Sequence, residues 1–429
     1  MLKYILGDIM DRIVMHIDVN SAFLSWSSLK LLKEGSKIDL RNEISVVSGD
    51  ESKRHGIVIA ASIPAKKIGI RSPMNLADAR KIYRDLYVTK PDREFYKECS
   101  KNMMRLIKYL FPTYEQFSID ECFVEYTEMR KMYGDEVKFA HKLKDEIYKR
   151  YGFTVNVGIG NNKLLAKMAS DFEKPNKVHT LYSNEIKEKM NPLPIRDLFM
   201  AGKSACAKLD SLGIKTIGDL ANYDQNKLVG ILKSQGKMLY EYANGIDDSP
   251  VENRYDDRKG IGFSKTLEDD IEDKTILYSE LNNFSKKISL ELKKRGLYAR
   301  TIVVTLRYTS FKTYNHQLKL DNNTNIEEDI FKNAKLAFNK LWNLEPVRLI
   351  GLRVTDMSNN NDIQLSLFDE NQKIITDKEL DKIIDNINKE FGSGTVFKGY
   401  DNMKKEKIEK WYKKLYNFTI GVLYYGWKY

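Results

Sequence analysis

Cysteine is scarce in this sequence. Of 429 residues only three are cysteines, Cys99, Cys122 and Cys206, and no two of them stand in a C-x-x-C spacing. This distribution excludes a disulfide framework and a cysteine-based zinc site. It is typical of a protein in a reducing compartment, so we expect a cytoplasmic location.

Long apolar runs are also missing. The longest strongly apolar stretch, residues 418–427, is too short to cross a bilayer, which takes about 20 apolar residues. The first residues carry acids where a signal peptide has its apolar segment, and Met10 is a second candidate initiator besides Met1. The sequence therefore predicts no role in a membrane.

What the chain does have is length and positive charge. With 42% hydrophobic and 31% charged residues it has a globular composition, and 429 residues are too many for one core, so we expect several domains. The net charge of +11 favours an anionic partner, although a Lys-rich composition serves solubility equally well.

Three acidic residues stand at informative positions. Asp18 ends the apolar run of residues 13–17, and the adjacent pair Asp120 and Glu121 follows far along the chain. A buried carboxylate is costly without a cation, and two adjacent acids plus a distant one suit a pair of Mg²⁺ ions in phosphoryl transfer. On a regular strand the adjacent pair would point to opposite faces, so this hypothesis needs a hairpin end or a bulge. The alternative is ordinary surface or helix-capping acids.

The first half of the chain has the periodicity of an α+β fold. Strand-like runs are predicted at residues 13–17, 44–47, 57–61, in two segments within 117–126, and at 155–159. Helical patterns are predicted at residues 21–33, 76–83, 94–111, 135–151 and 163–172. This order fits a ferredoxin-like sheet, in which helices cover one face and the carboxylates project from the other.

A composition shift at residues 191–194 marks a boundary, and short helices separated by glycines follow it. Helix-hairpin-helix segments of this kind bind a DNA backbone through exposed N–H groups, without reading its sequence. The hairpin here is Met200-Ala201-Gly202, with one glycine fewer than is usual, and a purely structural hairpin is the alternative. The candidate DNA contacts are Gly202 and Lys203.

A basic region follows a second boundary at residues 247–250. Residues 286–319 hold nine Lys or Arg and one acid, Glu291, over a predicted helix at 279–295 and an alternating strand at 300–307. Such a run is usually a solvated face, but a sheet that lays a basic face along a duplex explains it better. The candidate DNA contacts are Arg300, Arg307 and Lys312.

Four segments, in this order, resemble the catalytic motifs of the Y-family translesion DNA polymerases, in the bacterial branch of DNA polymerase IV and UmuC-like proteins. They are HIDVNSAFLSW at 16–26, AASIPAKKIGIRSPM at 60–74, SIDECF at 118–123 and VGIGNNKLLAKMASDFEKPN at 157–176. The resemblance covers residues 11 to about 370. It implies error-prone, template-directed DNA synthesis from dNTPs on a primer–template, without proofreading.

The resemblance also implies a right-hand polymerase with four domains. The expected parts are a ferredoxin-like palm (11–35 and 90–190), small fingers (36–89), a helix-hairpin-helix thumb (191–250), an α/β little finger (255–356), a linker (357–370) and a tail of unassigned role (371–429).

Carried over to single residues, the resemblance implies a metal site. Asp18, Asp120 and Glu121, assisted by the carbonyl of Val19, would ligate two Mg²⁺ ions, for which Mn²⁺ can substitute. Phe23 falls at the steric-gate position, where an aromatic ring excludes a ribose 2′-hydroxyl. Without the motif, Phe23 would be an ordinary core residue of a helix.

Two lysines match contacts to the triphosphate, Lys66 in the fingers and Lys174 in the palm. A solvated helix start is the alternative for Lys66. The chain departs from the family where Ile63-Pro64 replaces the usual Tyr-Glu pair, which removes a phosphate-binding hydroxyl and predicts weaker or altered nucleotide binding. Asn20 also replaces a frequent acid, a known variation of the pattern.

A short peptide after the polar linker resembles the bacterial sliding-clamp-binding motif. Its anchors are Gln364, Leu365, Leu367 and Phe368. A peptide of this kind fills a hydrophobic groove at a low ordering cost. We therefore expect a sliding clamp as a partner, besides primer–template DNA and dNTPs, and a monomeric protein.

Two other functions stay open at this point. A catalytically silent, DNA-binding accessory protein that recruits the clamp would be expected to lack a carboxylate, and all three are present. A nucleotidyl cyclase with a similar sheet has no use for the basic regions or the clamp peptide. Lesion preference, the need for an accessory subunit and the role of residues 404–429 do not follow from the sequence.

Overall fold

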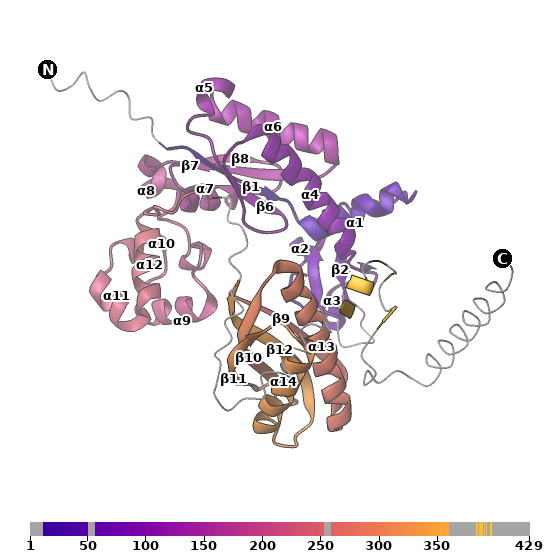
Figure 1. The fold of residues 1–429 in the computed structure, drawn as a ribbon. Helices are drawn as coiled ribbons and strands as arrows, with labels where there is room; N and C mark the ends of the chain where they lie inside the picture. The colour runs from indigo at the N-terminus through magenta and orange to yellow at the C-terminus, as the bar shows by residue number, and fades with distance from the viewer. Residues whose placement is uncertain are drawn as a thin grey trace. The chain divides into compact units, whose positions relative to one another are not determined.

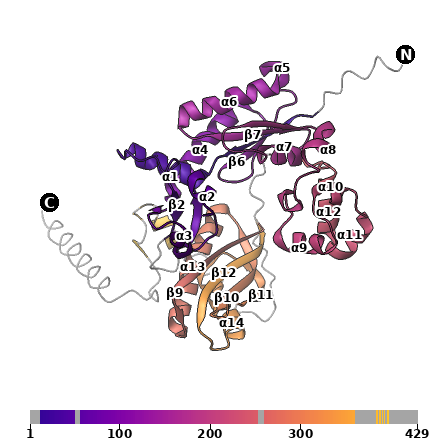
Figure 2. The same ribbon diagram turned by 180° about the vertical axis from the view of Figure 1, so that it is seen from behind.

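The structure, a computed structural model, describes residues 12–49, 56–252 and 259–359, with a few more between 383 and 396. The chain divides into two compact units, Met1–Asp257 and Arg258–Tyr429. Figures 1 and 2 show the elements of each unit from opposite sides. Within the described ranges, no helix is both long and apolar enough to cross a membrane.

The first unit contains a five-stranded sheet in the order β5-β6-β1-β7-β8. Its central strand pairs antiparallel with β6 and with β7, and β7 runs parallel to β8. The strands are β1 (Val14–Val19), β5 (Tyr114–Gln116), β6 (Glu121–Glu125), β7 (Val155–Gly160) and β8 (Val178–Leu181). Successive residues of β1 point to opposite faces, so His16 and Asp18 lie on the face opposite to Met15 and Ile17.

Two long helices, α4 (Arg93–Leu110) and α6 (Glu136–Tyr151), pack their apolar sides against one face of this sheet and form its main core. Each helix begins at an aspartate that accepts hydrogen bonds from N–H groups of the first turn, Asp92 for α4 and Asp135 for α6. Helix α6 ends at Gly152, whose φ of 77° is left-handed. Local capping thus fixes where the covering helices start and stop.

Helix α7 (Lys163–Ser170) lies against the opposite face, over β1 and β7 (Figure 1). Gly158 of β7 permits this close approach, because a Cβ there would lie 2.0 Å from the carbonyl oxygen of Ala166. The imidazole of His16 is fully buried on this face, with Nδ1 2.8 Å from Ser170 Oγ. On this face polar side chains such as His16, Asp18 and Ser170 lie beside the apolar Val14, Phe123 and Ala166, and we call its polar part the polar layer.

A smaller layer joins the sheet through helix α1 (Ala22–Lys33), which contacts α4 and the strands β2 and β3. Its three-stranded sheet has the order β3-β2-β4. Its elements are β2 (Ser45–Ser48), β3 (Val58–Ala61), α2 (Ile63–Lys67), α3 (Leu76–Ile82) and β4 (Tyr87–Thr89). Val46, Val58, Ala65 and Leu76 form its own small core.

The rest of the first unit is mostly helical. Its elements are α5 (Arg130–Tyr133), η3 (Ser183–Glu185), α8 (Ile186–Lys189), η4 (Ile195–Asp197), α9 (Lys203–Ser211), α10 (Ile217–Ala221), α11 (Gln225–Leu232) and α12 (Ser234–Ala243). Residues of α9–α12 share a hydrophobic core with Leu164, Leu165 and Met168 of α7. The segment after α12 is tied to the same helix, since Asn162 Nδ2 donates to the carbonyl of Gly245 at 2.8 Å.

The second unit is a four-stranded antiparallel sheet in the order β11-β10-β12-β9, with two helices packed on one face. The elements are β9 (Gly260–Ile271), α13 (Lys274–Arg295), β10 (Tyr298–Tyr308), β11 (Thr313–Thr324), α14 (Glu327–Leu341) and β12 (Val347–Ser358). Ile302, Val304 and Leu306 of β10 point into the core. The other face of this sheet has no helix of this unit packed on it within the described residues.

The α+β prediction is confirmed, but two predicted elements are wrong in detail. Only one strand, β6, lies within residues 117–126, because residues 117–120 form the turn that follows β5. The helix predicted at 279–295 begins at Lys274, because Asp273 caps it by accepting a hydrogen bond from Thr275 N–H. The predicted clamp peptide, Gln364–Phe368, and the tail at 404–429 lie outside the described residues.

Candidate active site

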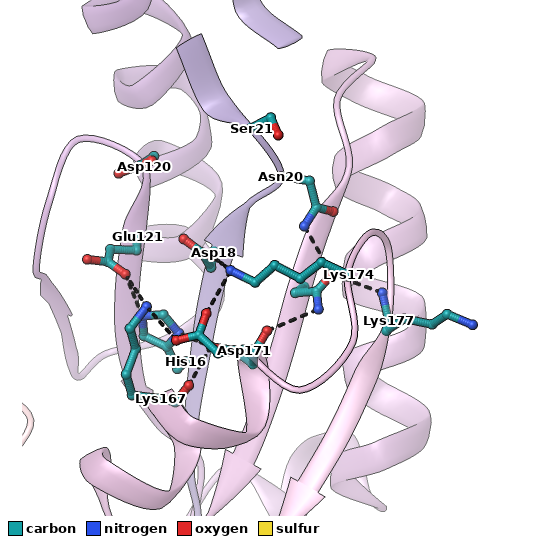
Figure 3. Close-up of polar contacts among 12 residues, drawn as sticks. His16, Asp18, Asn20, Ser21, Asp120, Glu121, Lys167, Asp171, Lys174 and Lys177 are labelled. Atoms are coloured by element: carbon teal, nitrogen blue, oxygen red, sulfur yellow. Dashed lines mark hydrogen bonds and ion pairs between the residues drawn. The ribbon is translucent and has the colours of Figure 1, made fainter. Parts of the chain in front are cut away.

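The sheet brings three acidic residues to one end of two neighbouring strands (Figure 3). Glu121, the first residue of β6, lies opposite Asp18 in the antiparallel register with β1. Asp120 precedes β6 in the turn, and its carbonyl oxygen accepts a 3.0 Å hydrogen bond from Val19 N–H. A hairpin end thus supplies the geometry by which two adjacent acids contribute to one site.

Asp120 has an environment that disfavours its negative charge. Burial raises its pKa, and the nearby charges of Asp18 and Glu121 raise it further. A 2.5 Å hydrogen bond from Ser118 Oγ to Oδ1 only partly opposes this effect. Crowded, half-buried carboxylates of this kind favour a cation between them.

Glu121 is stabilised by two groups of the polar layer. Its Oε2 lies 2.8 Å from Lys167 Nζ and 3.1 Å from His16 Nε2. Burial would raise the pKa of Glu121, but the contacts with His16 and Lys167 outweigh it and lower the pKa to about 2. Lys167 itself lies 3.5 Å from Asp171, so one ammonium group bridges two acids.

Two further lysines converge on the same end of the sheet. Lys174 forms ion pairs with Asp18 and, at 2.8 Å, with Asp171, and these acids raise its pKa against the opposing effect of burial. Lys66 Nζ donates a 2.8 Å hydrogen bond to Ser21 Oγ. Burial lowers the pKa of Lys66, and the charge of Lys174 lowers it further.

The residues present fit divalent cations. Within the described ranges, no three His, Cys, Asp or Glu side chains are already close enough to hold one metal ion. The carboxylates are instead paired with ammonium groups, Asp18 with Lys174 and Glu121 with Lys167. Carboxylate oxygens are the ligands that hard divalent ions prefer, and such an ion would compete with these ammonium groups for them.

Phe23 lies in the first turn of α1, the helix that follows β1. Its half-buried ring stacks on Tyr96, with centroids 5.1 Å apart, and meets Trp26 edge-on at 6.1 Å. Tyr96 is fixed in turn by a 2.5 Å hydrogen bond with Ser27. The aromatic support leaves Phe23 little freedom to turn away.

The departure at Ile63-Pro64 has a local structural role. Both residues lie in the first turn of α2, where Ser62 accepts a hydrogen bond from Ala65 N–H as the cap. Ile63 is 39% exposed and carries no hydroxyl. The position where the family usually has a tyrosine therefore carries no hydroxyl, while Lys66 lies on the same short helix.

The hairpin at Gly202 lies in the helical region of the first unit. Gly202 is the N-terminal cap of α9, Lys203 is the first residue of this helix, and Gly202 N–H donates to the carbonyl of Met200 at 3.0 Å. The left-handed position of this hairpin is taken by Met200, with a φ of 68°. Gly202 itself has ordinary backbone angles, so this hairpin departs from the glycine pattern that the prediction assumed.

The other DNA-contact candidates lie on the second unit. Arg307 projects from the helix-free face of β10, with its Nε 2.8 Å from Thr313 Oγ1, and Lys312 lies in the turn that leads to β11. Arg300 is engaged within the sheet, because its guanidinium donates to the carbonyls of Leu320 and Asp321. The alternation of this strand is also broken at its start, since a bulge leaves Thr301 buried.

The sequence prediction missed several residues of the polar layer, His16, Asn156, Lys167 and Asp171, and Arg353 on the second unit. Two of them had a readable signal. His16 precedes Asp18 by one strand period, and Lys167 stands four residues before Asp171 on a helix. The hydrogen bonds of Asn156 join segments that are distant in sequence, and Arg353 of β12 lies opposite Val303 of β10, so no local pattern reveals their places.

Comparisons with known proteins agree with this geometry. Residues 17–171 match the impB/mucB/samB family, and residues 258–367 match the impB/mucB/samB family C-terminal domain. The chain is 43% identical to DNA polymerase IV of Clostridium acetobutylicum, over 93% of this chain and 100% of that protein. It is 30% identical to DNA polymerase IV 1 of Bacillus subtilis, over 93% of this chain and 95% of that protein.

A solved structure, a Y-family DNA polymerase chimera, has the same fold. Its TM-score is 0.71, and the match covers 81% of this chain and 100% of that chain at 23% identity. The sequence matches extend over both compact units and the structural match over most of the chain. The chain therefore belongs to the Y-family DNA polymerases, together with the bacterial DNA polymerase IV proteins.

Proposed function

We propose how this chain, a template-directed DNA polymerase of the translesion type, performs its reaction at the end of β1 and β6. The primer 3′-hydroxyl attacks the α-phosphate of a dNTP, a new phosphodiester bond forms, and pyrophosphate leaves. The observation that carries the proposal is the convergence of Asp18, Asp120 and Glu121 with Lys66 and Lys174 at one end of the sheet. Negative groups for metal ions and positive groups for phosphates stand side by side there.

Asp18, Asp120 and Glu121, with the carbonyl of Val19, would hold two divalent cations, which we take to be Mg²⁺ with Mn²⁺ as a substitute. When bound, such cations stabilise the charge on the attacking and leaving oxygens of a phosphoryl transfer. A triphosphate that arrives at the site can take Lys174 away from Asp18, which frees this carboxylate for a cation. The lysine pairing thus partly neutralises the acids until substrate binds.

Lys66 and Lys174 would contact the triphosphate. An ammonium group has no preferred direction and can follow a phosphate as charge moves onto the leaving group. Because Ile63 has no hydroxyl, these two lysines would make most of the contacts from the fingers and the palm to the triphosphate. Phe23 would close the sugar pocket as the steric gate, supported by the ring of Tyr96.

The DNA contacts proposed here are of two kinds. Gly202 and Lys203 would meet the backbone at the start of α9, where N–H groups and a positive side chain face outward. Arg307 and Lys312 would meet it on the helix-free face of the second unit. Arg300 orders β11 in the structure, so we assign it an indirect role in shaping this face.

Gln364, Leu365, Leu367 and Phe368 would recruit a bacterial sliding clamp, and we propose that the protein acts as a monomer on DNA. The comparisons give no support to the alternative of a catalytically silent accessory protein. Three acids and three lysines arranged around one strand end also serve no purpose in such a protein.

Primer extension tests the proposed site. The double change Asp120→Asn with Glu121→Gln removes two negative charges at nearly constant volume, and extension should fall by about a thousandfold or more. The matched control, Asp145→Asn with Glu128→Gln, removes two charges from exposed positions and should leave extension unchanged. Template-dependent synthesis at the parent rate in the first variant would contradict the site.

A further inference from the structure

A buried amide lies beneath the loop that carries Lys174. Asn156, in β7, has no exposed surface, and its side chain makes four hydrogen bonds. Its Nδ2 donates to the carbonyls of Ser170 at 3.0 Å and Glu173 at 2.7 Å. Its Oδ1 accepts from Asn20 Nδ2 at 3.0 Å and from Lys177 N–H at 3.2 Å. One side chain therefore joins the end of α7 to both ends of the turn at residues 173–177.

Asn20 completes this connection from the other side. It follows β1 directly, two residues after Asp18, and only 6% of its surface is exposed. Its Oδ1 accepts a 2.8 Å hydrogen bond from Asn176 N–H, while its Nδ2 donates to Asn156. Its backbone is fixed as well, since its N–H donates to the carbonyl of Thr154 at 3.0 Å. Figure 3 shows Asn20, Lys174 and Lys177 in this part of the site.

The hydrogen bonds of Asn20 and Asn156 are made with backbone groups on both sides of Lys174 along the chain. The carbonyl of Glu173 precedes it, and the N–H groups of Asn176 and Lys177 follow it. The backbone on both sides of Lys174 is thus held by two amide side chains that are bonded to each other. The base of a long, flexible side chain is fixed in this way, and only its outer bonds remain free to move between Asp18 and a ligand.

We propose that Asn20 and Asn156 are a pair of positioning residues. They hold the backbone on both sides of Lys174 and thereby increase the affinity for the dNTP triphosphate. The proposal rests on the role of Lys174 in the proposed function. An amide suits both positions, because Asn20 donates one hydrogen bond and accepts another, and Asn156 donates two and accepts two. An aspartate at position 156 would put an oxygen against the two carbonyls that Nδ2 now serves.

The alternative is that the pair only stabilises the fold. The two roles differ in what they predict for nucleotide binding. Loss of a pair that only stabilises the fold lowers the resistance to unfolding and affects every ligand of the folded protein alike. Loss of a positioning pair weakens dNTP binding selectively, and this effect disappears once Lys174 no longer contributes an ammonium group.

The test measures dNTP affinity on a primer–template whose primer ends in a dideoxynucleotide, so that binding is read without turnover. The variants are Asn20→Ala, Lys174→Ala and the double change, with Asn156→Ser as a second probe of the same connection. Asn161→Ala is the control, because Asn161 makes comparable bonds at the other end of β7, to the carbonyl of Arg12 and from Ser183 N–H. Primer–template affinity and thermal unfolding are measured for every variant.

We expect Asn20→Ala and Asn156→Ser each to weaken dNTP binding by about tenfold with unchanged affinity for primer–template. Adding Asn20→Ala to Lys174→Ala should cause no further loss, because the pair acts through this lysine. Parent-like dNTP affinity in Asn20→Ala, while Lys174→Ala loses it, would overturn the inference and leave the proposed function intact. Unchanged affinity in Lys174→Ala would overturn the assigned lysine contact and the inference together.

Discussion

The two sheets of this protein are built alike and used differently. Each sheet has one face covered by two long helices, α4 and α6 in the first unit and α13 and α14 in the second. The remaining face of the first sheet is a buried polar layer, in which Asp18 and Glu121 are each matched by a lysine. The remaining face of the second sheet is lined by small residues such as Gly351 and carries the cations Arg307 and Arg353.

The difference suits what we propose that each face binds. A site that stabilises charge during a reaction needs its groups fixed and shielded from water, and buried charges persist only when they are paired. A face that lies along a duplex needs none of this, because phosphates are contacted from the surface and exchanged as the DNA moves. No acid occurs between residues 299 and 319, so β10 and the turn that follows it contribute only positive charge to the second unit.

The largest effect should come from the buried face. Asp18→Asn keeps the size of the side chain but removes one of three charges, and single-turnover extension should fall by about a thousandfold. Primer–template affinity, measured by fluorescence anisotropy, should stay the same, because Asp18 is only 9% exposed and contacts Lys174 rather than the surface. Comparable losses of rate and DNA affinity would show that the two faces do not divide the work in this way.

The second-largest effect concerns the proposed sugar pocket at Phe23. Phe23→Ala removes the proposed gate and should raise the ratio of ribonucleotide to deoxyribonucleotide incorporation by about ten- to a hundredfold, because a steric pocket is worth this much discrimination. Competition assays with paired dNTP and rNTP measure the ratio. Tyr96→Phe is the control, since it keeps the supporting ring at 5.1 Å and removes only its hydroxyl. An unchanged ratio in Phe23→Ala would refute the gate.

A smaller effect concerns how closely each face is packed, measured as the loss of stability when a methyl group is added to it. In Gly158→Ala the new methyl group would lie 2.0 Å from the carbonyl oxygen of Ala166, so α7 must shift, at a cost of about 1–3 kcal/mol in the free energy of unfolding. In Gly351→Ala the nearest atom is Ser264 Cβ at 3.1 Å, on a face where a side chain can turn toward solvent. Urea unfolding of each variant measures both changes. Equal destabilisation would mean that the second face is as closely covered as the first.

The sequence predicted the parts of the buried face that lie at element ends. Asp18 terminates an apolar strand and Asp120-Glu121 required a hairpin end, so the chemistry of these residues constrained their place before any fold was known. The family resemblance added Phe23, Lys66 and Lys174, which no spacing rule singles out. These roles remain predictions that the experiments above address.

Other parts of the site could not be predicted, for physical reasons. The hydrogen bonds of Asn156 join a strand, a helix end and a turn, and such a connection exists only once the three have packed together. Arg300 had the right charge and strand position for DNA, but a bulge and the neighbouring strand direct its guanidinium to backbone carbonyls. Register and bulges arise from tertiary pairing, which the period of a single strand does not contain.

The smallest effect should come from the helix-free face of the second sheet, which we call the open face. Arg307→Ala and Arg353→Ala should each weaken primer–template binding by about threefold near 0.15 M salt and lower the slope of log K against log salt by about 0.9, as the loss of one phosphate contact requires. Single-turnover extension at saturating DNA should not change. Arg295→Ala is the matched control, because Arg295 lies on α13 and pairs with Glu291 at 2.6 Å. A slope that falls in the control as much as in Arg307→Ala would mean that net charge, rather than the open face, attracts the DNA.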